Sequence, residues 1–190
     1  MAKKLKILIF PDPRLRKVAE KVLKFDKSLQ SLADDMLHTM YDANGIGLAA
    51  TQVDQHVRLV VMDLSDDRNE PRIFVNPSYK VLQNHNLFEF EEGCLSIPGF
   101  NETISRPNKI ELKWQDINGN EHNEEPEGLL TVCIQLLRRL CNRQGAHWLC
   151  ICQVPSKRGA SGAHSGQRPY TRWKLPAGIW RTLRRRARHP

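Results

Sequence analysis

The sequence predicts an α+β domain, with strands in the middle of the chain and a helix on either side of them. Three observations favour this class. Residues 26–43 space their apolar side chains as a helix does, the middle of the chain contains several β-branched or alternating runs, and residues 127–135 are mostly apolar and begin a second helix. The 190 residues are enough for one compact domain with an extension, and no internal repeat divides them.

The first elements are a short strand and a strong helix. Residues 5–10 (LKILIF) predict the strand, closed by a proline-containing turn at residues 11–15. Asp26 is placed to cap the helix that follows. The apolar residues of that helix at helical spacing are Leu29, Leu32, Met36, Leu37 and Met40.

The central part of the chain predicts a glycine-rich turn and then strands. Residues 45–53 turn into small side chains, and the β-branched runs at residues 57–64 and 72–79 predict two strands. Residues 88–100 first alternate in polarity and then contain the Pro98–Gly99 pair, which predicts a turn at these two residues.

The last periodic elements are a hairpin and the second helix. Residues 109–128 begin with an alternating strand, turn at Asn118–Gly119 and return as a polar strand. Residues 127–135 then start the second helix, whose apolar composition suits a buried position.

Charge divides the chain at Gln135. Residues 1–135 hold all 21 acidic residues and 16 of the 29 Lys and Arg residues, a net charge of −5. Residues 136–190 hold 13 basic residues and no Asp or Glu. Globular domains usually mix both signs of charge. We therefore expect a folded domain at residues 1–135 and a basic, acid-free tail at residues 136–190 that is poorly ordered.

Cysteine usage and hydropathy predict a cytoplasmic protein. Five cysteines, an odd number at irregular spacing, argue against a disulfide framework and favour a reducing compartment. No stretch approaches the roughly 18 uninterrupted apolar residues of a membrane span. The apolar residues near the N-terminus soon meet Pro11 and Pro13 and lack a signal-peptide cleavage site, so the sequence predicts no membrane association.

Two stretches have a chemical interpretation. Residues 45–52 (GIGLAATQ) place two glycines where a backbone can approach a ligand, followed by the amide of Gln52. Residues 91–96 (EEGCLS) place the thiol of Cys94 after two carboxylates and a glycine. A lone Gly-x-Gly is usually a tight turn and a lone Cys usually a small buried hydrophobe. The thiol becomes a candidate metal ligand when histidines lie nearby, and residues 127–135 are the natural place for them.

Together these stretches resemble the peptide deformylase family, close to its bacterial members. The resemblance covers about residues 5–135 and rests on the segments PDPRLRKVAEKV, MYDANGIGLAATQVD, EFEEGCLSIPG and EGLLTVCIQ. It implies a fold of mixed and antiparallel strands around a central helix. It also implies removal of the formyl group from N-formylmethionine at the start of nascent polypeptides. The metal for that reaction is Fe2+ in the cell, or another divalent ion, held by one Cys and two His.

The family's third motif, His-Glu-x-x-His, is absent from the place where the resemblance puts it. That motif stacks two His one helical turn apart, so that both reach one metal ion while the Glu acts as general base. Here Leu136 and Leu140 replace the two His, and Leu137 replaces the Glu. We therefore expect that the chain does not bind the metal stably and that its hydrolase activity is lost or severely impaired.

The remaining family residues carry over one by one. Cys94 corresponds to the thiolate ligand of the metal, and Gln52 to the amide that steadies the developing oxyanion, helped by the backbone N–H of Leu95. Gly47 corresponds to the backbone that binds the substrate peptide. The residues that correspond to the apolar pocket for the methionine side chain are Ile46, Leu129, Val132 and Cys133.

Three interpretations of the tail stay open. Candidate zinc ligands stand at Cys141, His147, Cys150 and Cys152, but their spacing matches no structural zinc pattern. Thirteen cations interleaved with aromatic residues are typical of a nucleic-acid contact, and the aromatic residues are Trp148, Tyr170, Trp173 and Trp180. The loss of every acid and the abrupt end of periodicity are typical of a shifted reading frame, which is the interpretation we favour.

Two alternatives to an impaired deformylase remain. One is a metal-free pseudoenzyme that still binds N-formylmethionyl peptides or ribosomes. The other is a chain whose basic tail binds RNA. Formyl-peptide binding without turnover would favour the first, and strongly salt-dependent RNA binding by residues 136–190 would favour the second.

Overall fold

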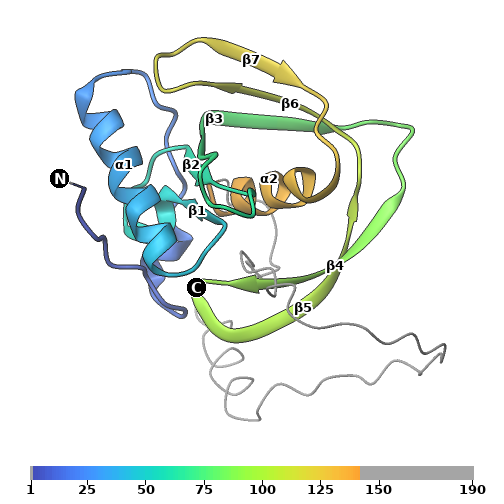
Figure 1. The fold of residues 1–190 in the computed structure, drawn as a ribbon, viewed down its shortest axis with the longest axis horizontal. Helices are drawn as coiled ribbons and strands as arrows, with labels where there is room; N and C mark the ends of the chain where they lie inside the picture. Colours follow the sequence, from blue (N-terminus) through green and yellow to red (C-terminus); the bar gives the residue numbers. More distant parts are fainter. Residues whose placement is uncertain (1, 142–190) are drawn as a thin grey trace, which may run out of the picture. The chain divides into compact units, whose positions relative to one another are not determined.

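A computed structural model describes residues 2–141 of the chain (Figure 1). The elements in chain order are η1 (Pro13–Arg16), α1 (Lys27–Asp42), β1 (Gly47–Ala49), η2 (Ala50–Val53), β2 (Leu59–Met62), β3 (Arg72–Val81), β4 (Leu87–Cys94), β5 (Ile97–Pro107), β6 (Ile110–Gln115), β7 (Glu121–Glu124) and α2 (Gly128–Cys141). The predictions about the tail beyond Cys141 lie outside the described residues. They concern its poor order, the zinc candidates His147, Cys150 and Cys152, and its aromatic residues.

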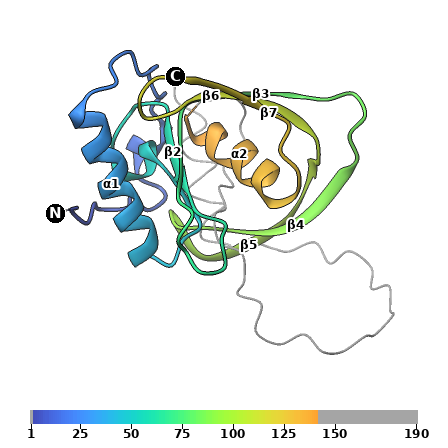
Figure 2. The ribbon, with the colours of Figure 1, turned by 45° about the horizontal axis from the view of Figure 1, so that its top comes forward.

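The strands form two antiparallel sheets. β1, β2, β3, β6 and β7 make a five-stranded sheet in that order, and β4 pairs with β5 in a second sheet. Figures 1 and 2 show α2 in the middle of the described residues, with strands of both sheets around it, while α1 lies outside, beside β1 and β2. This arrangement confirms the predicted α+β class with strands around a central helix.

α1 forms where the sequence predicts it, because its cap and its buried face are both encoded locally. The carboxylate of Asp26 accepts hydrogen bonds from the backbone N–H groups of Ser28 and Leu29. The buried residues of the helix recur every three or four positions and are Leu29, Ala33, Met36, Thr39 and Met40. The apolar ones share a core cluster with Leu48 of β1 and Val61 of β2, so α1 supports the strand that precedes Gln52.

The predicted central strands and the predicted hairpin are also present. Residues 57–64 and 72–79 contain β2 and the greater part of β3, and residues 109–128 contain the β6–β7 hairpin. In its turn Gly119 adopts a φ of 91°, a left-handed conformation that favours glycine. The carboxylate of Asp116 accepts hydrogen bonds from the backbone N–H groups at both ends of this turn.

The turn predicted at Pro98–Gly99 is wrong. Both residues lie within β5, and the chain reverses at Leu95 and Ser96 instead, so that Cys94 pairs with Ile97. Among residues 2–141, β5 pairs with β4 alone, and an edge position of this kind tolerates a proline without an N–H group. The local turn signal is therefore overridden by pairing with β4.

Residues 5–10 do not form the predicted strand. They run without regular secondary structure, and their N–H groups bind three different segments, at Thr39, Gln52 and Ser96, rather than one neighbouring strand. Leu8 is buried, and Leu5 and Ile7 pack against the cluster around α1. The apolar run therefore indicates burial correctly, but not a strand.

α2 begins at Gly128, as expected, and continues past Gln135 to Cys141. The change of charge at Gln135 therefore falls inside a helix. Leu136, Leu137 and Cys141 are buried in the core cluster on the other side of the five-stranded sheet from α1. Of the helices within residues 2–141, none is long and apolar enough to cross a membrane.

Candidate active site

Gln52 is held in a fully buried position by the turn that follows β1. β1 is an edge strand of the five-stranded sheet, and the chain passes from Ala49 directly into η2. The side-chain oxygen of Gln52 accepts a hydrogen bond from the Ala49 backbone N–H at 3.0 Å. Its side-chain nitrogen donates to Ser96 Oγ at 3.2 Å and to Cys94 Sγ at 3.9 Å. Because both ends of the amide have partners, its N–H groups face the thiol.

Cys94 lies at the end of β4, at an irregularity in the pairing with β5 between Gly93 and Cys94. Irregularities of this kind re-aim a side chain. The thiol is buried and its sulfur accepts a hydrogen bond from the backbone N–H of Ser96 at 3.3 Å. The structure therefore brings together Gln52 and Cys94, two of the predicted site residues that lie far apart in the sequence.

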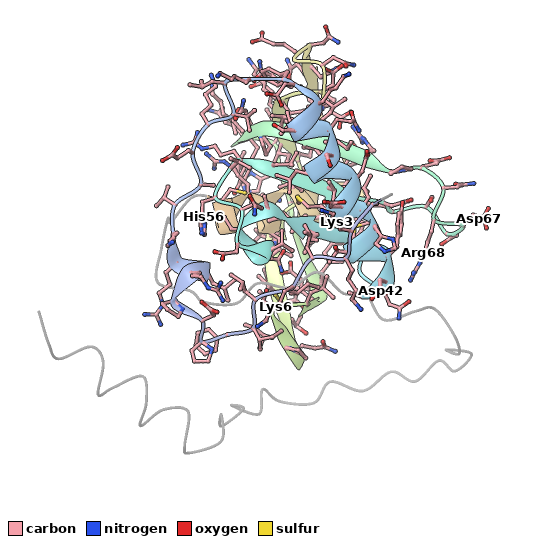
Figure 3. The ribbon with its side chains drawn as sticks, turned by 90° about the vertical axis from the view of Figure 1, so that its left-hand side faces the viewer. Lys3, Lys6, Asp42, His56, Asp67 and Arg68 are labelled. Carbon is pink, nitrogen blue, oxygen red and sulfur yellow. The ribbon has the colours of Figure 1, made fainter. Side chains whose placement is uncertain are left out.

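The N-terminal segment ties the two motifs to each other through the backbone. The N–H of Leu8 donates to the carbonyl oxygen of Gln52 at 2.7 Å, and the N–H of Phe10 donates to that of Ser96 at 2.8 Å. Figure 3 shows this segment passing from Lys3 to Lys6 on the face that also carries α1. The segment does not pair as a strand here and makes one backbone hydrogen bond to each motif.

The two glycines of the first motif allow close approach of side chains from elsewhere. A β-carbon on Gly45 would lie 2.8 Å from Leu95 Cδ1, and a β-carbon on Gly47 would lie 2.8 Å from Leu137 Cδ1. Real β-carbons do not approach other atoms so closely, so glycine is required at both positions unless a neighbour moves. These contacts link the first motif to the second through Leu95 and to α2 through Leu137.

Asp63 fixes the backbone just before β1. Its N–H donates to the carbonyl oxygen of Ile46 at 2.9 Å, and its carboxylate accepts hydrogen bonds from the Tyr41 hydroxyl and from both the N–H and the hydroxyl of Ser65. Burial and the hydrogen bond to Asp63 raise the pKa of Tyr41 to about 12, so the phenol stays protonated and keeps donating. The Ile46–Gly47 backbone is therefore anchored from the helix α1 side.

A buried ion pair stands two residues before Cys94. Arg106 donates to both carboxylate oxygens of Glu92, with Nε at 2.6 Å from one oxygen and a terminal nitrogen at 2.9 Å from the other. Both side chains are almost fully buried. Glu92 lies on β4 and Arg106 on β5, so the pair locks the two strands next to the thiol.

The predicted apolar pocket residues mostly gather in the cluster that contains Cys94. Ile46 and Leu129 are partly buried and pack against it, and Cys133 is a buried member. Val132 is buried as well, but it is not part of this cluster. α2 adds Leu136 and Leu137 to the cluster. Leu140 lies in α2, and its side chain is outside the described part of the structure.

The donor atoms around Cys94 do not fit a catalytic metal centre. Such a centre usually has three protein ligands. Beside the thiol of Cys94 stand the amide of Gln52 and the hydroxyl of Ser96, while α2 brings Leu136, Leu137 and the thiol of Cys133 into the same cluster. Among residues 2–141, no group of three His, Cys, Asp or Glu side chains is placed to hold a metal ion.

Sequence reasoning missed two residues of the site. Ser96 supplies the hydroxyl that orients the Gln52 amide, and Arg106 neutralises Glu92. Ser96 stands directly after Cys94-Leu95 in the second motif, so its position was a signal. Arg106 gives no local signal, because its role depends on the pairing of β4 with β5.

The fold places strands of two antiparallel sheets around a central helix and brings a buried amide and a buried thiol together. The chain belongs to the polypeptide deformylase family, whose model matches residues 4–136. The peptide deformylase of Pseudomonas aeruginosa is 54% identical over 131 residues, which are 69% of this chain and 77% of the relative. That of Cellvibrio japonicus is 55% identical over 131 residues, with the same shares covered.

Solved structures agree with this membership. The crystal structure of a peptide deformylase from Legionella pneumophila superposes with a TM-score of 0.68 at 45% identity, covering 73% of this chain and 81% of the other. That of a peptide deformylase from Synechococcus elongatus, in complex with actinonin, superposes with a TM-score of 0.69 at 37% identity, covering 74% and 79%. The resemblance seen in the sequence is therefore confirmed at the level of family and fold.

Proposed function

We propose that this chain is a member of the deformylase family that has lost the family's hydrolysis. Leu136, Leu137 and Leu140 stand where the third motif would supply two metal ligands and a general base. Water attacks a formamide carbon at a useful rate only when a base or a metal ion activates it. Leucine can neither bind a cation nor accept a proton, so the nucleophile is the missing part of the reaction.

The burial of Leu137 is the observation that supports this proposal most directly. Leu137 is fully buried and Leu136 nearly so, and both share a core cluster with Cys94. Hydrocarbon therefore lies on the side of the thiol from which the motif would present imidazole and carboxylate groups. The match to the family model, which ends at residue 136, supports the same conclusion.

Hydrolysis of a formyl-methionyl peptide tests the proposal. The purified chain, kept reduced and supplied with Fe2+ or Ni2+, is compared with a Cys94→Ala variant and with buffer containing the same metal. We expect all three rates to be equal. A metal-dependent rate that exceeds the buffer rate and disappears in Cys94→Ala would overturn the proposal.

The orientation of Gln52 favours a second candidate function, the binding of formyl-methionyl peptides without turnover. Its amide N–H groups face the site, and the anchored Ile46–Gly47 backbone lies next to it. The relatives from Synechococcus elongatus and Ehrlichia chaffeensis were solved with actinonin bound, so a ligand site exists in the family. The parts kept here would hold a formyl oxygen through Gln52 and the N–H of Leu95.

Binding of a labelled peptide separates the two candidates. A formylated peptide and its unformylated counterpart are titrated with the chain and followed by fluorescence anisotropy. We expect tighter binding of the formylated peptide, and loss of that preference in Gln52→Leu. Equal affinity for the two peptides would exclude the binding function and leave the loss of hydrolysis untouched.

Contacts with ribosomes or RNA and a cytoplasmic location stay predictions. The cations that suggest a nucleic-acid partner are concentrated in residues 136–190, most of which lie outside the described residues. A steep fall of RNA affinity with salt, abolished when the chain is cut after Cys141, is the result expected if the tail binds RNA.

A further inference from the structure

The end of α2 is built as core rather than as the wall of a site. Leu136, Leu137 and Cys141 are 2%, 0% and 1% exposed. They belong to one core cluster with Cys94 of β4, Ala49 of β1 and Met62 of β2. A catalytic metal site keeps one position open to water or substrate. The side chains at the end of α2 leave hydrocarbon at that place.

α2 packs closely against β1 because Leu137 of α2 lies against Gly47 of β1, which has no side chain. Leu137 Cδ1 occupies the space 2.8 Å from where a β-carbon of Gly47 would be. Leucine at this position therefore fills the groove that the glycine leaves, as interdigitating core residues do. A carboxylate at the same position would be buried against the same strand, where an unpaired charge is costly.

Three polar contacts attach the same part of α2 to other segments. The carbonyl oxygen of Cys141 accepts a hydrogen bond from Ala19 N–H at 3.0 Å, and the side-chain nitrogen of Gln135 donates to the carbonyl oxygen of Pro107 at 2.8 Å. The guanidinium of Arg138 lies 4.9 Å from the centre of the Tyr79 ring. The last turns are therefore fixed to the N-terminal segment, to the end of β5 and to β3.

We propose that Leu136, Leu137 and Cys141 form an apolar closure that replaces the metal centre as the tie between α2 and the Cys94 strand. The closure rests on the proposed function, because both follow from the leucines that stand in place of the third motif. In the family motif, one metal ion would join a thiolate on β4 to two imidazoles on α2. Here Leu136, Leu137 and Cys141 of α2 share a buried cluster with Cys94 of β4, so folding of the chain is independent of metal.

Thermal unfolding of the full chain with EDTA, with Ni2+ and with Zn2+ tests metal independence. We expect the Tm to be the same in EDTA and in a small excess of either ion. A Tm that rises with metal and falls with EDTA, with both shifts absent in Cys94→Ala, would overturn the proposal. A Tm shift that persists in Cys94→Ala comes from metal bound elsewhere in the chain. Folding at the Cys94 site would then still be independent of metal, as proposed.

Substitution of Leu137 tests the closure itself. Leu137→Met conserves volume and should lower the Tm by less than about 4 °C, whereas Leu137→Glu should lower it by roughly 10 °C or abolish folding. Equal Tm values for the two variants would show that residue 137 reaches water and would overturn the closure. If Leu137→Glu does not fold, Leu137→Met is compared with the cavity variant Leu137→Ala instead. A Tm loss in Leu137→Met as large as that in Leu137→Ala would show that the shape of the side chain, and not apolar filling, matters. That result would overturn the closure.

Failure of the closure and failure of the proposed function give different results. A chain that hydrolyses formyl-peptide with metal, yet has a Tm insensitive to metal and the expected order of Leu137 variants, would retain the closure and lose the function proposed above. A chain without hydrolysis whose Tm depends on metal at Cys94 would retain that function and lose the closure.

Discussion

Glu92 and Arg106 form a buried ion pair with two parallel hydrogen bonds, at 2.6 and 2.9 Å, across the β4–β5 sheet. Glu92 lies two residues before Cys94 on β4 and Arg106 lies on the partner strand β5, so the pair helps to hold the end of β4. Removing two charges from water is expensive, and their mutual attraction offsets that cost only while both partners are present.

Breaking this pair from one side should destabilise the chain strongly. Glu92→Gln removes the carboxylate that pairs with the buried Arg106 guanidinium, and we expect the free energy of unfolding to fall by about 3–5 kcal/mol. Urea denaturation followed by circular dichroism measures the change. The control is Glu111→Gln, which breaks the more exposed pair with Lys113 and should cost less than about 1 kcal/mol. Equal losses in the two variants would contradict the buried geometry.

Gly47 and Leu137 should be energetically coupled. Gly47→Ala places a methyl group where Leu137 Cδ1 now lies, and we expect a loss of about 1–3 kcal/mol from overpacking. Leu137→Ala leaves a cavity and should cost about 2–5 kcal/mol. In the double variant the alanine methyl occupies part of that cavity, so the combined loss should be smaller than the two single losses together by about 0.5–3 kcal/mol. Strict additivity would show that the two residues do not touch in solution.

Much of the fold was predictable because it is encoded locally. The cap at Asp26, the apolar spacing of α1 and the Asn118–Gly119 turn each depend on a few neighbouring residues, and the structure has them where the sequence placed them. The course of residues 5–10 and the reversal before Ile97 were not predictable in this way. Both depend on partners far away in the sequence: Gln52 and Ser96 for the first, and the register of β4 with β5 for the second.

The principal residues of the candidate site were predictable from the sequence, but the packing of α2 against them was not. The motifs gave Gln52 and Cys94, and only the fold could show that their side chains meet. The change of charge after Gln135 suggested a boundary, yet Leu136, Leu137, Leu140 and Cys141 continue a helical spacing of apolar residues. The predicted end of periodicity at Gln135 is therefore too early, because α2 continues to Cys141.

The stability of the chain should fall in alkali, in part because of Cys141. Burial raises the pKa of this thiol from 9.0 to about 12. A pKa raised by folding gives stability that is complete below the unfolded pKa and is lost as the pH rises through the folded pKa. The free energy of unfolding should therefore decline between about pH 9 and about pH 12, and less steeply in Cys141→Val. Urea midpoints measured under reducing conditions from about pH 8 upwards test this, and identical slopes would contradict the burial of the thiol.

Tyr41 provides a second, independent contribution in the same pH range. Burial and its hydrogen bond to Asp63 raise its pKa to about 12, so its share of the stability is also present below the unfolded pKa and lost above it. Tyr41→Phe should reduce the alkaline slope, and the combination with Cys141→Val should reduce it further. An unchanged slope in Tyr41→Phe would show that the phenol is not held by Asp63.

Titration of the reduced chain with Ni2+ or Co2+, with the bound metal counted after removal of free ion, tests the central claim most directly. A catalytic centre usually has three protein ligands, and among residues 2–141 no three His, Cys, Asp or Glu side chains gather to hold a metal ion. We predict well under one equivalent of metal per chain that depends on Cys94, so that the parent and Cys94→Ala bind alike. One full equivalent in the parent, lost in Cys94→Ala, would contradict the account and show that the chain supplies further ligands to this thiol.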